Sequence, residues 1–458
     1  MPGHKRNSFL PEDFSMDIRD LISMDITEIR DYDNLHHPEG IILESMEQLK
    51  EIYHTEKSWY LVNGSTVGIL ASISAVCQPG DEIIVARNCH RSVYNAIRLL
   101  HLNPLYIYPE YSREYDLFLD IREKQREDLG RLLEGHPRVK AVLITSPTYE
   151  GVVSDVAAIK EIIKPYGIPL IVDEAHGAHF IFHSAFPKSA VECGADLVIQ
   201  SVHKTLPCFT QTALLHLCSD LVSEDRIREM LSVYETSSPS YLLLASAEYG
   251  VAYVRNHSEK MQEYVDRLVD FRRKCGQLRH IRLFTPKNQD VFAYDQGKLV
   301  FTVKKTDGAS LFRRLFEDFG IECEMEAASF CLAMTSVNDT AETFARLEEA
   351  VFAIDKELDA DEEVASSPEE VPAGIYSLRH RRILPLWEAM DSEKKCIPWE
   401  ESAGEIAAEY IFLYPPGVPV LVPGEKITKE TVEKMKEYLY NGYNVPALSE
   451  GTVHVVSL

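Results

Sequence analysis

The sequence predicts an α/β fold with a mostly parallel central sheet, followed by a smaller α+β unit and a C-terminal α+β unit. Between about residues 58 and 217, short apolar runs alternate with helix-like segments, as in parallel strands joined by crossover helices. Polar residues directly follow several of these apolar runs. The length of 458 residues exceeds what one compact core accommodates, so two or three domains are expected.

The first predicted strand covers Trp59–Val62, and Asn63-Gly64-Ser65-Thr66 then open an apolar helix. Glycine permits a tight turn, the hydroxyls of Ser65 and Thr66 can donate hydrogen bonds, and a helix N-terminus points free N–H groups at an anion. The segment therefore suggests a phosphate cup. A simple helix cap by Ser65 or Thr66 fits these residues about equally well.

The next predicted strand is Glu82–Ala86, which is followed by Asn88-Cys89-His90-Arg91-Ser92 and another helix. The flat ring of His90 could stack on a planar cofactor. A partly exposed histidine near a helix start is the simpler interpretation if the segment is taken alone. Cys89 is interpreted as a small buried residue rather than a nucleophile.

Two later apolar runs, Ile168–Val172 and Ala195–Gln200, each end beside a residue suited to cofactor chemistry. Asp173 ends the first run, and Ser201-Val202-His203-Lys204 follows the second. Taken alone, Asp173 would be a helix cap and Lys204 a solvated loop residue. Their separation of 31 residues leaves room for one crossover, which places both at the rim where such sheets bind ligands. Pyridoxal phosphate requires a lysine that forms an imine and an aspartate that pairs with the pyridine nitrogen.

Composition excludes several other classes. The formal net charge of −25 argues against nucleic-acid binding. No run of about eighteen apolar residues and no signal-peptide pattern is present, so a cytoplasmic protein without a membrane partner is expected. Nine cysteines without a CxxC pair argue against a disulfide framework or a zinc ribbon. The spacing of His176, His179 and His183 is not diagnostic, so no metal site is predicted.

Downstream of the large sheet, a helical run is predicted from Ala245 to Cys275. An acidic, proline-containing segment predicts a linker before the C-terminal unit. The further strands are expected at Leu299–Val303, Ile321–Met325, Phe330–Met334 and Tyr410–Leu413, and the further helices around Ala309–Phe319, Thr340–Leu358 and Lys429–Tyr440. The expected divisions are an arm at 1–30, a large cofactor-binding domain at 31–255, a small domain at 256–358, the linker at 359–372 and a C-terminal domain at 373–458.

Together, these segments resemble the prokaryotic ornithine/lysine/arginine decarboxylases, pyridoxal phosphate enzymes with the aspartate aminotransferase fold. The chain is most similar to the short members, which lack an N-terminal wing domain. An acidic residue is expected near Ala327, where this chain reads Glu324-Met325-Glu326-Ala327. The motifs that carry the resemblance are Pro2-Gly3-His4-Lys5, Asp25-Ile26-Thr27-Glu28, Asp173-Glu174-Ala175-His176-Gly177, Ser201-Val202-His203-Lys204, Thr236-Ser237-Ser238-Pro239-Ser240-Tyr241, Gly404-Glu405-Ile406-Ala407-Ala408-Glu409 and Tyr414-Pro415-Pro416-Gly417-Val418-Pro419.

The resemblance implies that Lys204 carries pyridoxal phosphate, that Asp173 pairs with its ring nitrogen and that His90 stacks on the ring. It implies a homodimer or a higher multiple in which Ser237 and Ser238 reach the neighbouring subunit's site. The reaction implied is α-decarboxylation of arginine, lysine or ornithine for polyamine synthesis, with Lys204 or His203 returning a proton. The remaining implied cofactor-binding residues are Ser65, Thr66, Ala175, His176, Ser201 and His203.

An aminotransferase or a carbon–sulfur lyase of the same fold is the main alternative. Aminotransferases typically carry a small residue before the lysine and an aromatic ring over the cofactor, whereas this chain has His203 and His90. They also anchor the α-carboxylate with an arginine, for which Arg379, Arg381 and Arg382 are candidates. A non-catalytic regulator is the other alternative, and the intact Lys204 and Asp173 argue against it.

Overall fold

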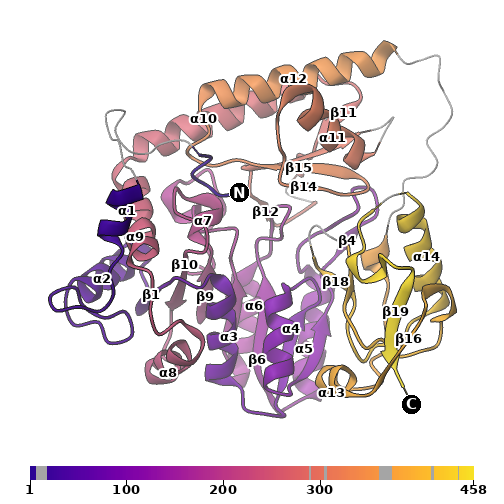
Figure 1. The fold of residues 1–458 in the computed structure, drawn as a ribbon, viewed down its shortest axis with the longest axis horizontal. Helices are drawn as coiled ribbons and strands as arrows, with labels where there is room; N and C mark the ends of the chain where they lie inside the picture. The colour runs from indigo at the N-terminus through magenta and orange to yellow at the C-terminus, as the bar shows by residue number, and fades with distance from the viewer. Residues whose placement is uncertain are drawn as a thin grey trace.

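The computed structural model describes residues 1–6, 18–287, 290–303, 307–360, 374–413, 417–441 and 443–457. At its centre is a seven-stranded sheet in which only β10 runs antiparallel to its neighbours. The predicted mostly parallel sheet is therefore confirmed (Figure 1). The strand order is β1 (Lys57–Leu61), β10 (Ala213–Leu217), β9 (Leu197–Gln200), β8 (Leu170–Asp173), β6 (Val139–Thr145), β2 (Glu82–Ala86) and β3 (Asn103–Ile107).

Both faces of this sheet are covered. Alternate residues of β2 enter two separate cores, with Ile83 in one and Ile84 in the other. Burial on both faces explains why the strands read as continuous apolar runs rather than as alternating ones. One core includes residues of α2 (Ile41–Tyr53), α3 (Ser65–Val76), α4 (Arg91–Leu99) and α8 (Glu224–Tyr234), and the other includes residues of α5 (Glu123–Gly135) and α6 (Val156–Ile163).

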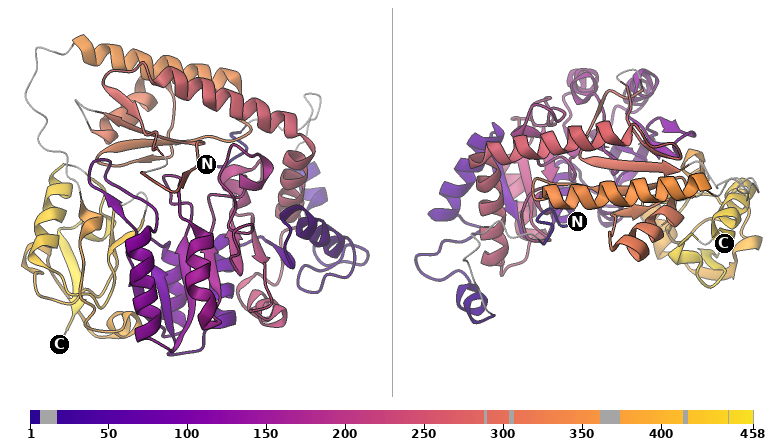
Figure 2. Two further views of the ribbon diagram at one scale, coloured as in Figure 1. Left: turned by 180° about the vertical axis from the view of Figure 1, so that it is seen from behind. Right: turned by 90° about the horizontal axis from the view of Figure 1, so that it is seen from above.

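The smaller unit is built on a four-stranded antiparallel sheet. Two long helices, α10 (Ser258–Cys275) and α12 (Ala341–Ala360), lie side by side over it (Figure 2). The predicted helical run from Ala245 to Cys275 consists of two helices, because His257 separates α10 from α9 (Tyr241–Asn256). The strand order is β11 (Ile281–Leu283), β13 (Lys298–Val303), β15 (Phe330–Met334) and β14 (Met325–Glu326), and α11 (Gly308–Phe319) packs against them.

The strand predicted at Ile321–Met325 is wrong for most of its length, because β14 begins only at Met325. The cause is the end of α11, where Gly320 adopts the left-handed conformation (φ 65°). The N–H of Ile321 then donates back to the carbonyl of Leu315 (2.8 Å), so it is not available to a sheet.

The C-terminal unit lies beside the large sheet and has its own core around Trp399, Met435 and Tyr438 (Figure 1). The predicted linker at 359–372 falls mainly outside the described residues, and α12 extends to Ala360 before it. The predicted domain divisions stay predictions. The elements of this unit are α13 (Leu386–Asp391), β16 (Lys394–Pro398) paired with β19 (Thr452–Val456), β17 (Ile411–Phe412) paired with β18 (Pro419–Leu421), and α14 (Lys429–Tyr440).

Two short helices and a pair of short strands complete the description of the fold. The short helix α7 (Val202–Thr205) follows β9, and α1 (Ile18–Met24) lies near the N-terminus. Strand β7 (Val152–Val153) pairs with β12 (Ala293–Tyr294) and thereby joins the large and small units. Among the described residues, no helix has both the length and the apolar character needed to cross a bilayer.

Candidate active site

A cleft of about 570 Å³ lies between the carboxyl ends of the parallel strands, the small unit and the C-terminal unit. Residues at or just after four strand ends line it: Asn88 after β2, Thr145 ending β6, Asp173 ending β8 and Ser201 after β9. This is the edge at which open α/β sheets bind ligands. The cleft is therefore the candidate active site.

Most of the residues singled out from the sequence meet in this cleft. Ser237 and Ser238 do not line it, because they are exposed in the turn between α8 and α9. Their predicted role concerns a neighbouring subunit and stays a prediction. The nine that line the cleft are Ser65, Thr66, His90, Asp173, Ala175, His176, Ser201, His203 and Lys204.

Lys204 and Asp173 are the central pair of ionisable groups. Helix α7 begins directly after β9 and places the Nζ of Lys204 3.0 Å from Nε2 of His176. Asp173 is 3% exposed, and its Oδ1 accepts the backbone N–H of Ala175 (3.2 Å). Burial raises the pKa of Asp173, although His90 and Lys204 oppose the shift, and burial lowers the pKa of Lys204. A protonated ring nitrogen placed against Asp173 would supply the buried carboxylate with a close cation.

His90 lies at the start of a helix. It precedes the first turn of α4, where its Nδ1 accepts the backbone N–H of Ser92 (3.2 Å) and lies 2.8 Å from the Ser92 hydroxyl. The helix-start interpretation is thus confirmed. Burial lowers the pKa of His90, which favours a neutral ring in the cleft. Ring stacking by His90 stays a prediction.

His203 is held by the backbone of the strand beside it. Its Nδ1 lies 2.7 Å from the carbonyl oxygen of Thr212, so Nδ1 carries the proton in a neutral ring. Burial lowers the pKa of His203, despite the hydrogen bond to Thr212. Its other ring nitrogen, Nε2, is then an acceptor.

Several buried polar atoms at this edge lack a protein partner. Within the described part of the chain, Asn88 Oδ1, Thr145 Oγ1 and Ser201 Oγ have no hydrogen-bond partner. An unmet buried polar group costs roughly 1–3 kcal/mol, so these atoms fit a polar ligand in the cleft. Gly64 (φ 78°) precedes the first turn of the 12-residue helix α3, whose free N–H groups suit a phosphate. Pyridoxal phosphate fits this set of residues.

The cleft also has an acidic wall that the sequence indicated only in part. Glu324 lies near the expected acidic position, and its Oε1 accepts the hydroxyl of Tyr149 (2.6 Å), while its Oε2 pairs with the Met1 ammonium (2.7 Å). Burial opposes these contacts, but together with Lys298 they hold the pKa of Glu324 below its usual value. Besides Asp173, the carboxyl groups that line the cleft are those of Asp116, Glu150, Glu324 and Glu326.

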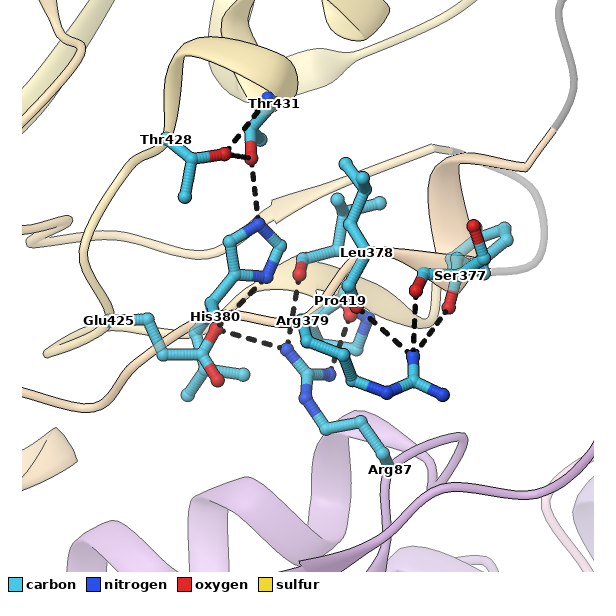
Figure 3. Close-up of polar contacts among 12 residues, drawn as sticks. Arg87, Ser377, Leu378, Arg379, His380, Pro419, Glu425, Thr428 and Thr431 are labelled. Atoms are coloured by element: carbon cyan, nitrogen blue, oxygen red, sulfur yellow. Dashed lines mark hydrogen bonds and ion pairs between the residues drawn. The ribbon is translucent and has the colours of Figure 1, made fainter.

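The C-terminal unit closes the far side of the cleft and is fastened beside it. Arg87 directly precedes Asn88, and its guanidinium donates to the carbonyl oxygens of Pro419 (2.7 Å) and Val420 (3.1 Å) and to Glu425 (3.1 Å). Figure 3 shows Arg87 reaching from the large domain into this unit. The cleft-lining residues of this unit are Tyr376, Leu413, Gly417, Val418, Tyr438, Tyr443 and Asn444.

The three histidines considered as metal ligands make separate contacts. His176 lies near Lys204, Nε2 of His179 lies 3.3 Å from Asp295, and Nε2 of His183 lies 3.0 Å from Gln262. Across the residues that the structure describes, no group of three or more histidine, cysteine, aspartate or glutamate side chains is arranged to hold a metal ion.

The sequence interpretation missed Thr145, Asp116 and Glu150. Thr145 ends β6 as Asp173 ends β8, so the strand-end rule could have found it. Arg87 had a signal too, because it directly follows the apolar strand Glu82–Ala86. Asp116 and Glu150 lie in loop segments that reach the cleft only through tertiary packing, and no local pattern distinguishes them.

A lysine and an aspartate at adjacent strand ends, beside unmet hydroxyls on an aspartate-aminotransferase-like sheet, define a pyridoxal phosphate-dependent enzyme. Comparisons with known proteins show which family within this class of enzymes the chain belongs to. The family model described as Orn/Lys/Arg decarboxylase, major domain, matches residues 1–325, and that of the family's C-terminal domain matches residues 386–444. The chain belongs to the Orn/Lys/Arg decarboxylase family, and it is a pyridoxal phosphate-dependent amino-acid decarboxylase.

Individual relatives agree with this membership. The chain is 32% identical to the arginine decarboxylase of Bacillus subtilis (strain 168), over all of this chain and 93% of the relative. It is 33% identical to an uncharacterised protein of the same organism, YaaO, over 96% of this chain and 90% of the relative. The solved structure of lysine decarboxylase A from Pseudomonas aeruginosa has the same fold, with a TM-score of 0.81 at 19% identity, covering 95% of this chain and 74% of that one.

Proposed function

We propose that the protein removes the α-carboxylate of a basic L-amino acid, arginine, lysine or ornithine, and releases the corresponding amine. The observation that carries this proposal is the charge of the cleft. Besides Asp173, four carboxyl groups line it, and its described lining residues include no arginine. A cationic side chain is attracted to such a wall, and a substrate α-carboxylate meets no fixed guanidinium.

The residues have distinct tasks in this proposal. Lys204 bonds to the cofactor, and Asp173 holds a proton on the cofactor's ring nitrogen. Pyridoxal phosphate, when bound, takes up the electron pair that the departing carbon dioxide leaves at Cα. Lys204 or His203 then returns a proton to Cα as a general acid. Ser65, Thr66 and Ser201 bind the phosphate, His90 and Ala175 contact the two ring faces, and His176 lies beside Lys204.

The positions of the candidate arginines support decarboxylation over amino transfer. The Arg379 guanidinium stacks on Tyr108, with 3.8 Å between its central carbon and the ring centroid. Arg382 donates to the carbonyl oxygen of Pro104 (2.8 Å). Neither these two nor Arg381 is among the residues lining the cleft.

The test measures carbon dioxide released from carboxyl-labelled arginine, lysine and ornithine without added keto acid. Arginine is tried first, because it is the substrate in the name of the 32% identical relative. We expect release from one of the three, no release by Lys204→Ala, and borohydride fixation of the cofactor on the Lys204 peptide. Turnover that requires a keto acid would instead establish the aminotransferase alternative, and fixation on another lysine would overturn the site assignment.

We also propose a homodimer, or a multiple of it, whose sites are completed by the partner's Ser237 and Ser238. The exposure of both residues supports this role, since it leaves them accessible to a second chain. Inactive Lys204→Ala chains mixed with chains carrying Ser237→Ala and Ser238→Ala should regain partial activity. Demonstrated subunit exchange without any recovery would contradict shared sites.

The amine product suits polyamine synthesis in the cytoplasm, which we propose as pathway and compartment. Deletion of the gene should lower the cellular pool of the amine that the purified protein makes. Fractionation should recover the protein in the cytoplasmic fraction. An unchanged pool would contradict the pathway, and recovery elsewhere would contradict the compartment.

A further inference from the structure

Lys298 is a buried lysine at the start of β13 with no assigned role. It is 1% exposed, and its Nζ lies 2.9 Å from Nδ1 of His176. The other ring nitrogen of His176, Nε2, lies 3.0 Å from the Nζ of Lys204. His176 therefore bridges two lysines, one from the small sheet and one from the end of the large sheet.

The backbone makes room for this bridge. Gly151 has a φ of 101°, and a Cβ atom there would lie 2.5 Å from Cγ of Lys298. A side chain at position 151 would therefore clash with Lys298. The adjacent ring of Tyr149, with its centroid 4.6 Å from that of His176, packs against the imidazole. Packing thus holds the imidazole between the two lysines.

The bridge imposes a proton requirement. A neutral imidazole has one N–H donor and one acceptor nitrogen, and an ammonium group can only donate. Lys204 and Lys298 therefore cannot both be ammonium ions while both contacts are hydrogen bonds. One lysine donates to the ring as an ammonium, and the other accepts from the ring as a free amine.

Burial disfavours the charged form of both lysines. Burial lowers the pKa of Lys298 to about 8, against the attraction of Asp295 and Glu324, and burial also lowers the pKa of Lys204 against Asp173 and Glu324. Burial and both lysines hold the pKa of His176 well below its usual value, so its ring stays neutral. The charged and titratable groups facing the bridge are Lys5, His90, Glu150, Asp173, His203, Asp295 and Glu324.

We propose that Lys298 stores the proton of Lys204 and exchanges it through the ring of His176. In the starting state the Lys204 ammonium donates to Nε2, and Nδ1–H donates to the Lys298 amine. Transfer breaks the N–H bonds at Lys204 and Nδ1 and forms N–H bonds at Nε2 and Lys298. His176 is left as its other tautomer, and the total charge is unchanged.

Lys298 is then a positioning residue, because it acts through His176 and does not line the cleft. The inference rests on the proposed assignment of Lys204 as the cofactor lysine. It gives Lys204 a way to become a free amine, as bonding to an aldehyde requires, without releasing a proton into bulk water. It also predicts a property of the cofactor-free protein that is separate from its activity.

The test follows the amine of Lys204 in the full-length protein after removal of pyridoxal phosphate. Reductive methylation with formaldehyde and cyanoborohydride labels only free amines. It is carried out across a pH series, and mass spectrometry of the Lys204 peptide gives the midpoint, which is the pH at which Lys204 labelling is half complete. Lys298→Met removes the group that stores the proton, so the midpoint should rise. Labelling at neutral pH should fall about tenfold for each pH unit by which the midpoint rises. Lys298→Arg adds a cation that only donates, so Lys204 must accept from Nε2–H and its midpoint should fall.

The relay predicts opposite shifts from these two variants, and so does a through-space charge effect, so the role of the His176 ring is tested separately. In a His176→Phe background the difference between Met and Arg at position 298 should vanish, whereas a through-space charge effect would persist. Lys160→Met is the matched control, because Lys160 pairs with Asp196 at the other end of β9 and should leave the midpoint unchanged. Lys298→Gln repeats the neutral change if Lys298→Met fails to fold.

Shifts in the same direction, no shift, or a difference that survives in His176→Phe would overturn the relay. These outcomes are distinguishable from failure of the proposed function. Borohydride fixation on a lysine other than Lys204 would refute the site assignment, and it is measured on the cofactor-loaded protein. The midpoints are measured without cofactor or substrate.

Discussion

Arg87 and Asn88 are neighbours after β2, yet their side chains have opposite environments. Both residues are 6% exposed. The guanidinium of Arg87 donates to Pro419, Val420 and Glu425, whereas Oδ1 of Asn88 has no hydrogen-bond partner in the described part of the protein. Buried polar groups normally have hydrogen-bond partners within the protein. The Arg87 contacts therefore hold the two units together, whereas the Asn88 amide oxygen is left open to a ligand.

The same contrast separates two larger regions. We call Arg87, His380, Glu425 and Thr431 the clamp. Figure 3 shows Arg87 of the large domain paired with Glu425 of the C-terminal unit, and His380 of that unit in contact with Glu425 and Thr431. The cleft, in contrast, holds buried polar atoms that have no hydrogen-bond partner among the described residues. Substitutions in the clamp should therefore change stability, and substitutions in the cleft should change catalysis at little cost in stability.

Asp173→Asn tests the cleft most severely. The rate of carbon dioxide release should fall at least about 100-fold, because an amide does not hold a proton on the cofactor's ring nitrogen. The free energy of unfolding should change by less than about 1 kcal/mol, since the variant replaces a carboxyl whose charge burial already disfavours. Retained visible absorbance would show that the cofactor still binds. A near wild-type rate would make Asp173 a structural residue only.

Arg87→Met tests the clamp. Removing one partner of a buried ion pair leaves Glu425 unpaired, so unfolding by urea should become easier by about 3–5 kcal/mol. The double variant Arg87→Met/Glu425→Gln is the control and should recover part of the loss. A cost below about 1 kcal/mol would show that the clamp contributes no cohesion.

His380 makes the clamp sensitive to acid. Burial, followed by Arg87 and Arg379, lowers the pKa of His380 to about 4, and its side chain is 2% exposed. An unfolded histidine takes up a proton near pH 6.5, so the stability that neutral His380 provides is complete above that pH and is lost as the pH falls towards 4. The loss should be about 2–3 kcal/mol in wild type and absent in His380→Gln.

The exposed His37 provides the control for this pH dependence. His37→Gln should leave the slope of stability against pH unchanged between pH 6.5 and 4. A wild-type slope that survives in His380→Gln would assign the acid sensitivity to other groups.

Ser201 and Ser189 give the smallest and best matched comparison, because both are 0% exposed. The Ser189 hydroxyl donates to Glu174 (2.6 Å), whereas Ser201 Oγ has no partner among the described residues. Ser189→Ala should cost about 1–2 kcal/mol of stability and leave cofactor affinity unchanged. Ser201→Ala should cost less than about 0.5 kcal/mol and lower cofactor affinity about tenfold, measured by equilibrium titration. Equal effects of the two variants would remove the contrast.

The parts of the fold that could be predicted from the sequence are those with strong local signals. Glu82–Ala86 and Lys429–Tyr440 match β2 and α14 residue for residue, because an apolar run bounded by polar residues and an amphipathic run after Thr428 each specify one element. Ile321–Met325 has strand-like residues, but the turn after α11 takes its first N–H. A local sequence pattern does not show that a helix-ending turn and a sheet compete for the same backbone N–H.

The candidate site divides in the same way. Asp173 and Lys204 could be found because strand ends collect at one edge of the sheet. Lys298 could not be found, because it belongs to another sheet and meets His176 only through packing across 122 residues of sequence. Glu324 was indicated only by resemblance.

The distance along the chain between the two halves of the clamp also sets an order of assembly. Arg87 meets Pro419 and Glu425 across 332 and 338 residues. A ribosome that adds 5–20 residues per second needs roughly 20–70 s to cover that interval. During that interval the guanidinium can pair with the nearby Tyr94 hydroxyl, to which it donates in the folded protein (3.0 Å), but not with the C-terminal unit. The far wall of the cleft is thus made well after the strand ends that face it, and a nascent chain offers the cofactor a closed pocket only once the C-terminal unit has been added.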